Sequence, residues 1–239
     1  MLSYDGTDYR GWQAQPAGPT VQGALLEAAR AFDAGARIGG ASRTDAGVHA
    51  LRQIASLATT ATLSSEAVQG ALNARLPRDI RVLEVCRAPS QFNARRAALG
   101  KRYAYLIDNG PIASPLLSRY AWHVGAPLDL AAMRRGLGPL LGRHDFGAFC
   151  AAPGRLKDQA CRLRAVHVLR RKARVAVFLS ADRYLHHMAR NIVGSLVAVG
   201  RGAREPEWLA RVLASRDRRL AGATAPAHGL ALVRVLYPR

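Results

Sequence analysis

Short strand-like segments are spread along the whole chain between amphipathic helices, and this order limits the fold more than any other feature of the sequence. Strand patterns occur in six segments, namely 52–59, 80–85, 101–107, 163–169, 174–180 and 230–236. A short basic turn separates the fourth of these from the fifth, which predicts a hairpin. Because strands and helices do not alternate regularly, the sequence predicts an α+β fold with mainly antiparallel sheet.

Helices are predicted where apolar residues recur at helical spacing. The clearest pattern runs over 184–199, with Gly200 as its stop and an apolar stripe made of Leu185, Met188, Ile192, Leu196 and Val199. Four further helices are predicted, after the N-cap residue Thr20, at about 65–76, at 130–141 and from near Pro206. The helices therefore occur in both halves of the chain.

The charge of the chain is strongly positive. Its formal net charge is +19 and its sequence pI about 11.3, so a polyanion such as nucleic acid is the expected partner. Residues 1–100 carry 11 basic and 8 acidic side chains, whereas residues 101–239 carry 24 and 8. The basic surface is therefore predicted mainly in the C-terminal part.

The sequence also bears on the compartment. Its longest apolar stretches, such as 192–200, are shorter than the about 20 residues that cross a bilayer, and the N-terminus lacks the pattern of a signal peptide. Cys86, Cys150 and Cys161 are scattered and form neither a disulfide framework nor a C-x-x-C pair. The sequence predicts a cytoplasmic protein with free thiols.

Asp45 is the most unusual acidic residue, in a loop of residues 42–50 ahead of a strand. It is the only carboxylate between residues 34 and 65, and three basic residues are close in sequence, Arg37, Arg43 and Arg52. Such surroundings favour the ionised form, and an ionised, partly desolvated carboxylate is a competent nucleophile. The alternative is that Asp45 only forms an Asx-turn ahead of Gly47, and spacing alone does not decide between the two.

Other chemistries fit this loop less well. A glycosidase needs two carboxylates and a magnesium site needs a cluster of acids, whereas the loop supplies one carboxylate. A metal site could instead use His144, Asp145, His186 and His187. Adjacent histidines on a helix point about 100 degrees apart, however, and no recognisable ligand spacing is present. The sequence therefore predicts no catalytic metal.

Seven short motifs follow one another along nearly the whole chain. They are YDGT at 4–7, GWQ at 11–13, TVQ at 20–22, RTDAGVHA at 43–50, KRY at 101–103, HDF at 144–146 and LHHMARNIVG at 185–194. In this order they resemble the signatures of the tRNA pseudouridine synthase A family. Any one motif is weak evidence, but seven in order are highly specific.

The resemblance implies a fold and a division of the chain. The family has two α+β lobes of ferredoxin-like topology, whose sheets join into one platform with the active-site cleft between them. Residues 1–92 would form the N-terminal lobe with the catalytic Asp loop. Residues 93–239 would form the C-terminal lobe with the Tyr strand and the Arg helix. The chain begins inside what should be the first strand, so that strand is expected to be short or the start truncated.

The resemblance also implies roles for four residues. Asp45 matches the essential catalytic aspartate, and Arg190 matches an arginine placed to pair with it. Tyr103 matches the tyrosine that packs on the target base. Arg43 matches an arginine implicated in taking the place of the flipped nucleotide, although phosphate binding is an alternative role. Tyr105 is expected to serve in ordinary aromatic packing.

The implied activity is an isomerase that converts uridine to pseudouridine at positions 38 to 40 in the anticodon stem-loop of tRNA. It needs no cofactor or metal, and the family acts as a homodimer. The aspartate could attack C1′, add to C6 or assist a glycal route, and the sequence leaves these open. Three rival functions are a tRNA-binding module without catalysis, a pseudouridine synthase with another RNA target, and a metal-dependent hydrolase built on His144 and Asp145.

Overall fold

The computed structural model describes residues 1–151 and 158–238, and the chain forms two compact units. The first unit contains residues 1–99 and the chain from residue 231 onward, and the second contains residues 100–230. The C-terminal strand thus belongs with the N-terminal part of the chain. A single boundary in the sequence, such as the one predicted after residue 92, does not describe a unit that consists of two separate segments.

The sheet of the first unit has the strand order β5-β1-β3-β11. These strands are β5 (Ile80–Val82), β1 (Leu2–Tyr4), β3 (His49–Gln53) and β11 (Leu230–Leu236). The strand β1 is antiparallel to β3 and β5, whereas β11 pairs with β3 in parallel. A separate antiparallel ribbon consists of β2 (Arg37–Gly40) and β4 (Ala55–Ala58).

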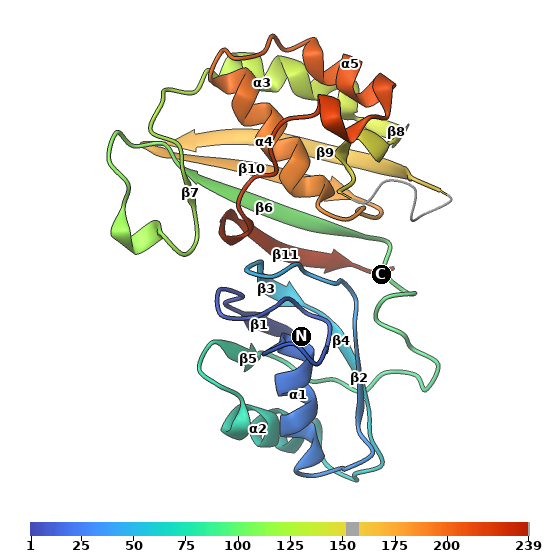
Figure 1. Cartoon of the computed structure of the whole chain (residues 1–239). Coiled ribbons are helices and arrows are strands. Elements are labelled where there is room, and N and C mark those ends of the chain that lie inside the picture. The colour runs from blue at the N-terminus through green and yellow to red at the C-terminus, as the bar shows by residue number, and fades with distance from the viewer. Residues whose placement is uncertain (152–157, 239) are drawn as a thin grey trace. The chain divides into compact units, whose positions relative to one another are not determined.

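Two helices complete the first unit, α1 (Val21–Arg30) and α2 (Ser65–Arg75), and they lie side by side (Figure 1). The hydroxyl of Thr20 accepts a hydrogen bond from the amide of Gly23, which confirms the predicted N-cap. Ser64 caps α2 in the same way through the amide of Ala67. Along the sequence this unit runs strand, helix, three strands, helix, strand, and β11 joins it from the far end of the chain.

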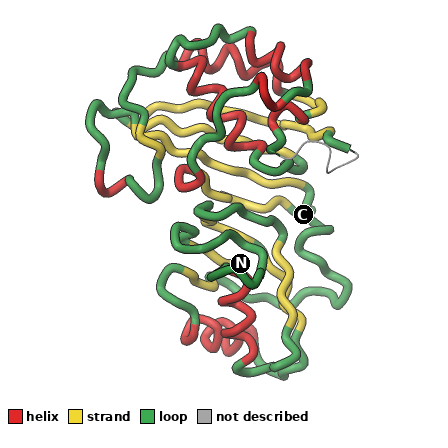
Figure 2. Tube along the Cα trace, viewed as in Figure 1, coloured by secondary structure: helices red, strands yellow, loops and turns green. Residues whose placement is uncertain are grey.

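The sheet of the second unit has the order β6-β10-β9-β8 and is antiparallel. Its strands are β6 (Gly100–Asp108), β10 (Arg174–Ala181), β9 (Ala160–Arg171) and β8 (Gly142–Asp145). A short strand β7 (Trp122–His123) pairs with β6 in parallel. The strands β9 and β10 form the predicted hairpin, and the long strands of this sheet are plain in Figure 2.

Three helices cover one face of this second sheet (Figure 1): α3 (Leu130–Leu137), α4 (Met188–Gly200) and α5 (Trp208–Ser215). Buried and less buried residues alternate along β10, as expected for a strand with one covered face. Short 3₁₀ turns lie at Pro115–Leu117, Gly138–Leu140, Gly147–Phe149, Arg218–Leu220 and Ala227–Gly229.

The predicted α+β class with mainly antiparallel sheet is confirmed, and some element boundaries differ from the sequence prediction. The predicted strand 52–59 is two strands, β3 and β4, on either side of Ile54. The predicted helix 184–199 begins only at Met188, because His187 has a left-handed backbone with φ of 59°. The predicted helix 130–141 ends at Leu137 and continues as a 3₁₀ turn that contains Pro139.

Two further sequence predictions can be compared with the structure. Across the described residues, none of the helices combines the length and the apolar character that a bilayer crossing requires. Cys86 is exposed, Cys150 and Cys161 are buried, and all three are free thiols. Burial raises the pKa of the Cys161 thiol to about 12, so this side chain is uncharged at neutral pH.

Candidate active site

The loop that carries Asp45 is fixed to its own unit on both sides of the aspartate. The amide of Trp12 donates a hydrogen bond of 3.0 Å to the carbonyl of Thr44. The hydroxyls of Thr44 and Tyr4 are 2.8 Å apart, and both side chains are buried. Gln53 is fully buried and bonds both the amide and the carbonyl of Ser42, at 3.3 and 2.8 Å. The chain before Asp45 therefore has little freedom.

Asp45 itself is half-buried at the start of a tight turn. The amide of Val48 donates to the Asp45 carbonyl at 3.1 Å, and the amide of Gly47 donates to the carbonyl of Tyr9 at 3.3 Å. The turn thus presents the Asp45 side chain from a main chain that is bonded on both sides. A half-buried carboxylate held in this way is suited to nucleophilic or general-base chemistry.

Gly11 makes the close approach of this loop possible. Its φ is +88°, a conformation that side chains disfavour. A Cβ atom at residue 11 would lie 2.6 Å from the carbonyl oxygen of Thr44 and 3.1 Å from the carbonyl carbon of Asp45. The GWQ motif therefore supports the loop through Gly11 and Trp12. This role was missed in the sequence, where a glycine inside a motif was the available signal.

His49 joins the end of the loop to the YDGT motif. Its side chain is buried, and its Nδ1 accepts a hydrogen bond of 3.0 Å from the amide of Gly6. The same nitrogen lies 3.1 Å from Oδ1 of Asp5, and this oxygen accepts bonds from the amide and hydroxyl of Thr7. Two motifs that are over 40 residues apart in sequence thus form one local structure.

The other predicted residue of the first unit is Arg43, which lies next to Thr44 and is exposed. Because its side chain is exposed, it is accessible to a large ligand such as RNA, whereas its neighbours Ser42 and Thr44 are buried. Asp45 and Arg43 therefore lie in the same loop of the first unit. The two other predicted residues, Tyr103 and Arg190, belong to the second unit.

Tyr103 lies on β6, opposite Leu179 of β10, and is only 6% exposed. Its ring meets the ring of Tyr184 edge-on, with centroids 4.9 Å apart and an angle of 77° between the planes. Tyr105, two residues further on, is fully buried, and its hydroxyl donates to the carbonyl of Pro226 at 2.8 Å. Ordinary packing was expected for Tyr105, and these contacts agree with that role.

Arg190 lies in the first turns of α4 and is half-buried. Its Nε donates to the carbonyl of Ala225 at 2.7 Å, and the amide of Ala225 donates back to the Arg190 carbonyl at 3.2 Å. Burial raises the pKa of Tyr105, and the positive charge of Arg190 opposes this increase. Arg190 and the tyrosine strand β6 are thus connected through one segment, Ala225 and Pro226.

This segment is part of a longer connection, residues 218–226, which we call the strap. The buried amide of Asn191 binds Thr224 and Arg218 of the strap through its oxygen, at 2.7 and 3.1 Å. Its nitrogen donates to the carbonyl of Phe149 at 2.7 Å. Ser195 accepts a bond from the amide of Gly222 at 2.9 Å. The strap therefore fixes α4, and with it Arg190, through buried polar groups.

Two of the four residues of the alternative metal site, His144 and Asp145, have other partners. Nε2 of His144 lies 2.7 Å from the carbonyl of Leu141, and Oδ1 of Asp145 accepts a bond from the amide of Gly147. Nε of Arg216 lies 3.6 Å from the Asp145 carboxylate. The HDF motif thus stabilises a turn, which gives it a structural role.

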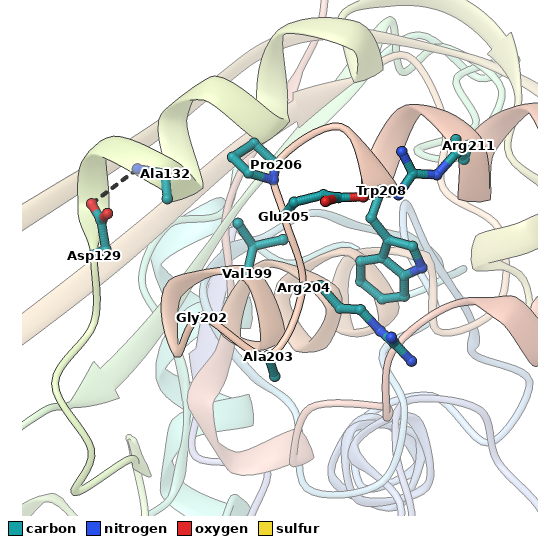
Figure 3. Close-up of a pocket in the computed structure, with 10 residues that line it drawn as sticks. All are labelled: Asp129, Ala132, Val199, Gly202, Ala203, Arg204, Glu205, Pro206, Trp208 and Arg211. Carbon is teal, nitrogen blue, oxygen red and sulfur yellow. Dashed lines mark hydrogen bonds and ion pairs between the residues drawn. The ribbon is translucent and has the colours of Figure 1, made fainter.

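A pocket of about 540 Å³ lies elsewhere in the second unit, beside the ends of α4 and α5 (Figure 3). Arg204 lies 5.4 Å from the centre of the Trp208 ring, and Arg211 pairs with Glu205. Asp129 caps α3 through the amide of Ala132. The lining includes none of the four predicted site residues, and its charges of both signs give it no single preference for a charged ligand.

Comparisons with known proteins identify what the chain is similar to. It matches the family described as tRNA pseudouridine synthase over residues 1–95 and 139–238. It is 43% identical over 239 residues to the tRNA pseudouridine synthase A of Myxococcus xanthus, covering 99% of this chain and 90% of that protein. The protein of the same name from Moorella thermoacetica is 42% identical over 240 residues, with 99% and 97% covered. The Chloroflexus aurantiacus protein is 43% identical over 246 residues, with 100% and 87% covered.

Proposed function

Because the chain belongs to the tRNA pseudouridine synthase family, we propose that it isomerises uridine to pseudouridine in tRNA, with Asp45 as the catalytic carboxylate. The observation that carries the proposal is the Asp45 loop. A half-buried carboxylate stands in a turn whose main chain is bonded through Thr44, Gly47 and Val48. A fixed orientation is what a nucleophile or base needs in order to act on one atom of a bound substrate.

The reaction requires no change of oxidation state. The bond between N1 of uracil and C1′ of ribose breaks, the base turns, and a bond between C5 and C1′ forms. The proton of C5 leaves and N1 gains a proton, so atoms and charges balance without any cofactor that donates or accepts electrons or a chemical group. A carboxylate is sufficient for this chemistry, whether it attacks C1′, adds to C6 or assists removal of the C2′ proton.

The second unit is proposed to supply the groups that hold the base and the carboxylate. The target uridine must leave its stack, at a cost of a few kcal/mol that contacts in the enzyme offset. Tyr103 is proposed to pack on the extruded base, and Arg190 to pair with Asp45 and keep it ionised. Arg43 of the first unit is proposed to fill the space that the base leaves, for which its exposure is suitable.

The substrate is proposed to be the anticodon stem-loop, with modification at positions 38 to 40. Loop nucleotides and distorted pairs unstack more easily than bases inside a regular helix. The excess of basic residues after residue 100 supports a large contact with the phosphate backbone. We further propose that the protein acts as a homodimer in the cytoplasm, where tRNA is modified.

The function can be tested with purified protein and an unmodified tRNA transcript, without added metal or cofactor. We expect pseudouridine at one or more of positions 38 to 40, located by reverse transcription after carbodiimide treatment. Pseudouridine at other positions only would assign a different RNA target. Tight tRNA binding without any pseudouridine would favour the binding-module function.

The oligomeric state needs its own measurement. Size-exclusion chromatography with light scattering is expected to give a mass of twice 25.7 kDa for the free protein. A mass of one chain, both free and with bound tRNA, would contradict the homodimer.

A further inference from the structure

Tyr184 lies in the turn between β10 and α4, where the chain passes from the sheet to the helix of Arg190. The strand ends at Ala181 and the helix begins at Met188. From this turn the Tyr184 ring reaches the ring of Tyr103, with the centroids 4.9 Å apart and the planes at 77°. This edge-to-face geometry is a favoured arrangement of two aromatic rings, and it depends on the orientation of both.

The hydroxyl of Tyr184 does not explain why a tyrosine occupies this position. It is buried and forms no hydrogen bond of ordinary geometry with any described residue. Burial raises the pKa of Tyr184 well above its usual range. A buried hydroxyl without a partner destabilises the folded state, so phenylalanine would fold at least as well here. The contribution of the residue must therefore come from its ring.

The position of Tyr184 connects two groups of the proposed site. Three residues after it, His187 adopts a left-handed backbone, and α4 begins at the next residue. Arg190 follows within the first turn and is held by Ala225. The same short turn thus contacts the ring of Tyr103 and leads directly into the helix that carries Arg190.

We propose that Tyr184 is a positioning residue, whose ring fixes the orientation of the Tyr103 ring for packing on the target base. The inference rests on the proposed function, because it assumes that Tyr103 contacts the base. Stacking is effective only when the two ring planes are aligned, so a Tyr103 ring that can tilt would hold the extruded base poorly. The base would then occupy the reactive orientation for a smaller share of the time.

The test compares three variants with the wild type. Tyr184→Leu removes the aromatic edge, and Tyr184→Phe keeps it and removes only the hydroxyl. Met133→Ala is the matched control, because Met133 is fully buried on α3, near Gly200, and lies outside the proposed site. If Tyr184→Leu does not fold, Tyr184→Met takes its place, since methionine fills irregular space without an aromatic ring.

Three quantities are measured at a temperature where every variant is folded. They are tritium release from 5-tritiated uridine in tRNA, the Kd for tRNA, and the fluorescence of 2-aminopurine placed beside the target uridine. For Tyr184→Leu we expect kcat to fall about tenfold with Kd changed less than about twofold. The fluorescence increase on base extrusion should fall with kcat. Tyr184→Phe should keep all three quantities near their wild-type values, and Met133→Ala should leave kcat near that of the wild type.

Two results would overturn this inference and leave the proposed function intact. In the first, the wild type is active, but Tyr184→Leu and Met133→Ala lose the same share of kcat, which would indicate a merely structural role. The other is a loss confined to Kd. A wild type that releases no tritium would instead remove the proposed function and this inference with it.

Discussion

The Asp45 loop of the first unit is fixed mainly through its main chain, whereas the Arg190 helix of the second unit is fixed by buried polar side chains. In the loop, the carbonyls of Thr44 and Asp45 and the amides of Gly47 and Val48 are all bonded. In the helix, Asn191 and Ser195 are fully buried and bind the strap, residues 218–226. The loop should therefore be sensitive to backbone changes, and the helix to the loss of single polar groups.

One substitution should disrupt the helix most strongly. A Cβ atom at Gly194 would lie 1.8 Å from the carbonyl oxygen of Ala223 in the strap, so Gly194→Ala must force the strap away from α4. We expect the free energy of unfolding to fall by about 2–4 kcal/mol, measured by denaturant unfolding. If Gly194→Ala were as stable as the wild type, the strap would not be packed against the helix.

Gly11→Ala should have the next largest effect, and it acts on the loop. The left-handed backbone and the contact with Thr44 should together lower the free energy of unfolding by about 1–3 kcal/mol. The rate of tritium release should fall further than stability alone explains, because the main chain next to Asp45 must move.

The control for this variant is Gly70→Ala. Gly70 lies on the exposed side of α2, and a Cβ atom there would meet nothing within 4 Å. This change should stabilise the helix by about 0.5–1 kcal/mol. If Gly11→Ala and Gly70→Ala changed the free energy of unfolding and the rate of tritium release equally, Gly11 would not support the loop as we propose.

Thr224→Val tests the polar contacts of the strap without a change of volume. Its hydroxyl donates to the buried amide oxygen of Asn191 and accepts a bond from Arg218, so its loss removes one partner from each of these groups. We expect a loss of about 1–3 kcal/mol in thermal or denaturant unfolding. Thr62→Val, at an exposed residue of the first unit, should change stability by less than about 0.5 kcal/mol.

The smallest effect concerns the thiols, which report on each unit separately. Cys86 is exposed in the first unit, whereas Cys161 is buried in the second and burial raises its pKa to about 12. At pH 8 iodoacetamide should therefore alkylate Cys86 and leave Cys161 unmodified, as mass spectrometry of peptides can show. Comparable labelling of both would mean that the second unit opens readily.

The sequence was sufficient for the class of fold and for most elements, because capping and periodicity are local. Thr20 was correctly predicted as an N-cap, and the segment 230–236 as a strand. The start of α4 was predicted too early, because nothing in the apolar stripe reveals the left-handed backbone of His187. The parallel pairing of β11 with β3 depends on residues far apart in sequence, and no local pattern contains it.

For the candidate site, the sequence identified motifs but not how they support one another. The bond between Gly6 and His49 joins two motifs, and the Asn191 contacts explain why polar residues occur inside an apolar helix. The edge contact between Tyr103 and Tyr184 joins residues about 80 positions apart, which periodicity cannot reveal. The roles of Asp45, Arg190, Tyr103 and Arg43 in catalysis and binding stay predictions.

The most direct test of the central claim is the activity of Asp45→Asn, a nearly isosteric change that removes the carboxylate. Tritium release from 5-tritiated uridine is measured in a tRNA with a uridine at position 39, together with the Kd for the same tRNA. We predict a loss of at least about 10³-fold in kcat with a Kd near that of the wild type. Near-normal release, or a large loss of binding with activity retained, would contradict the assignment of Asp45 as the catalytic carboxylate.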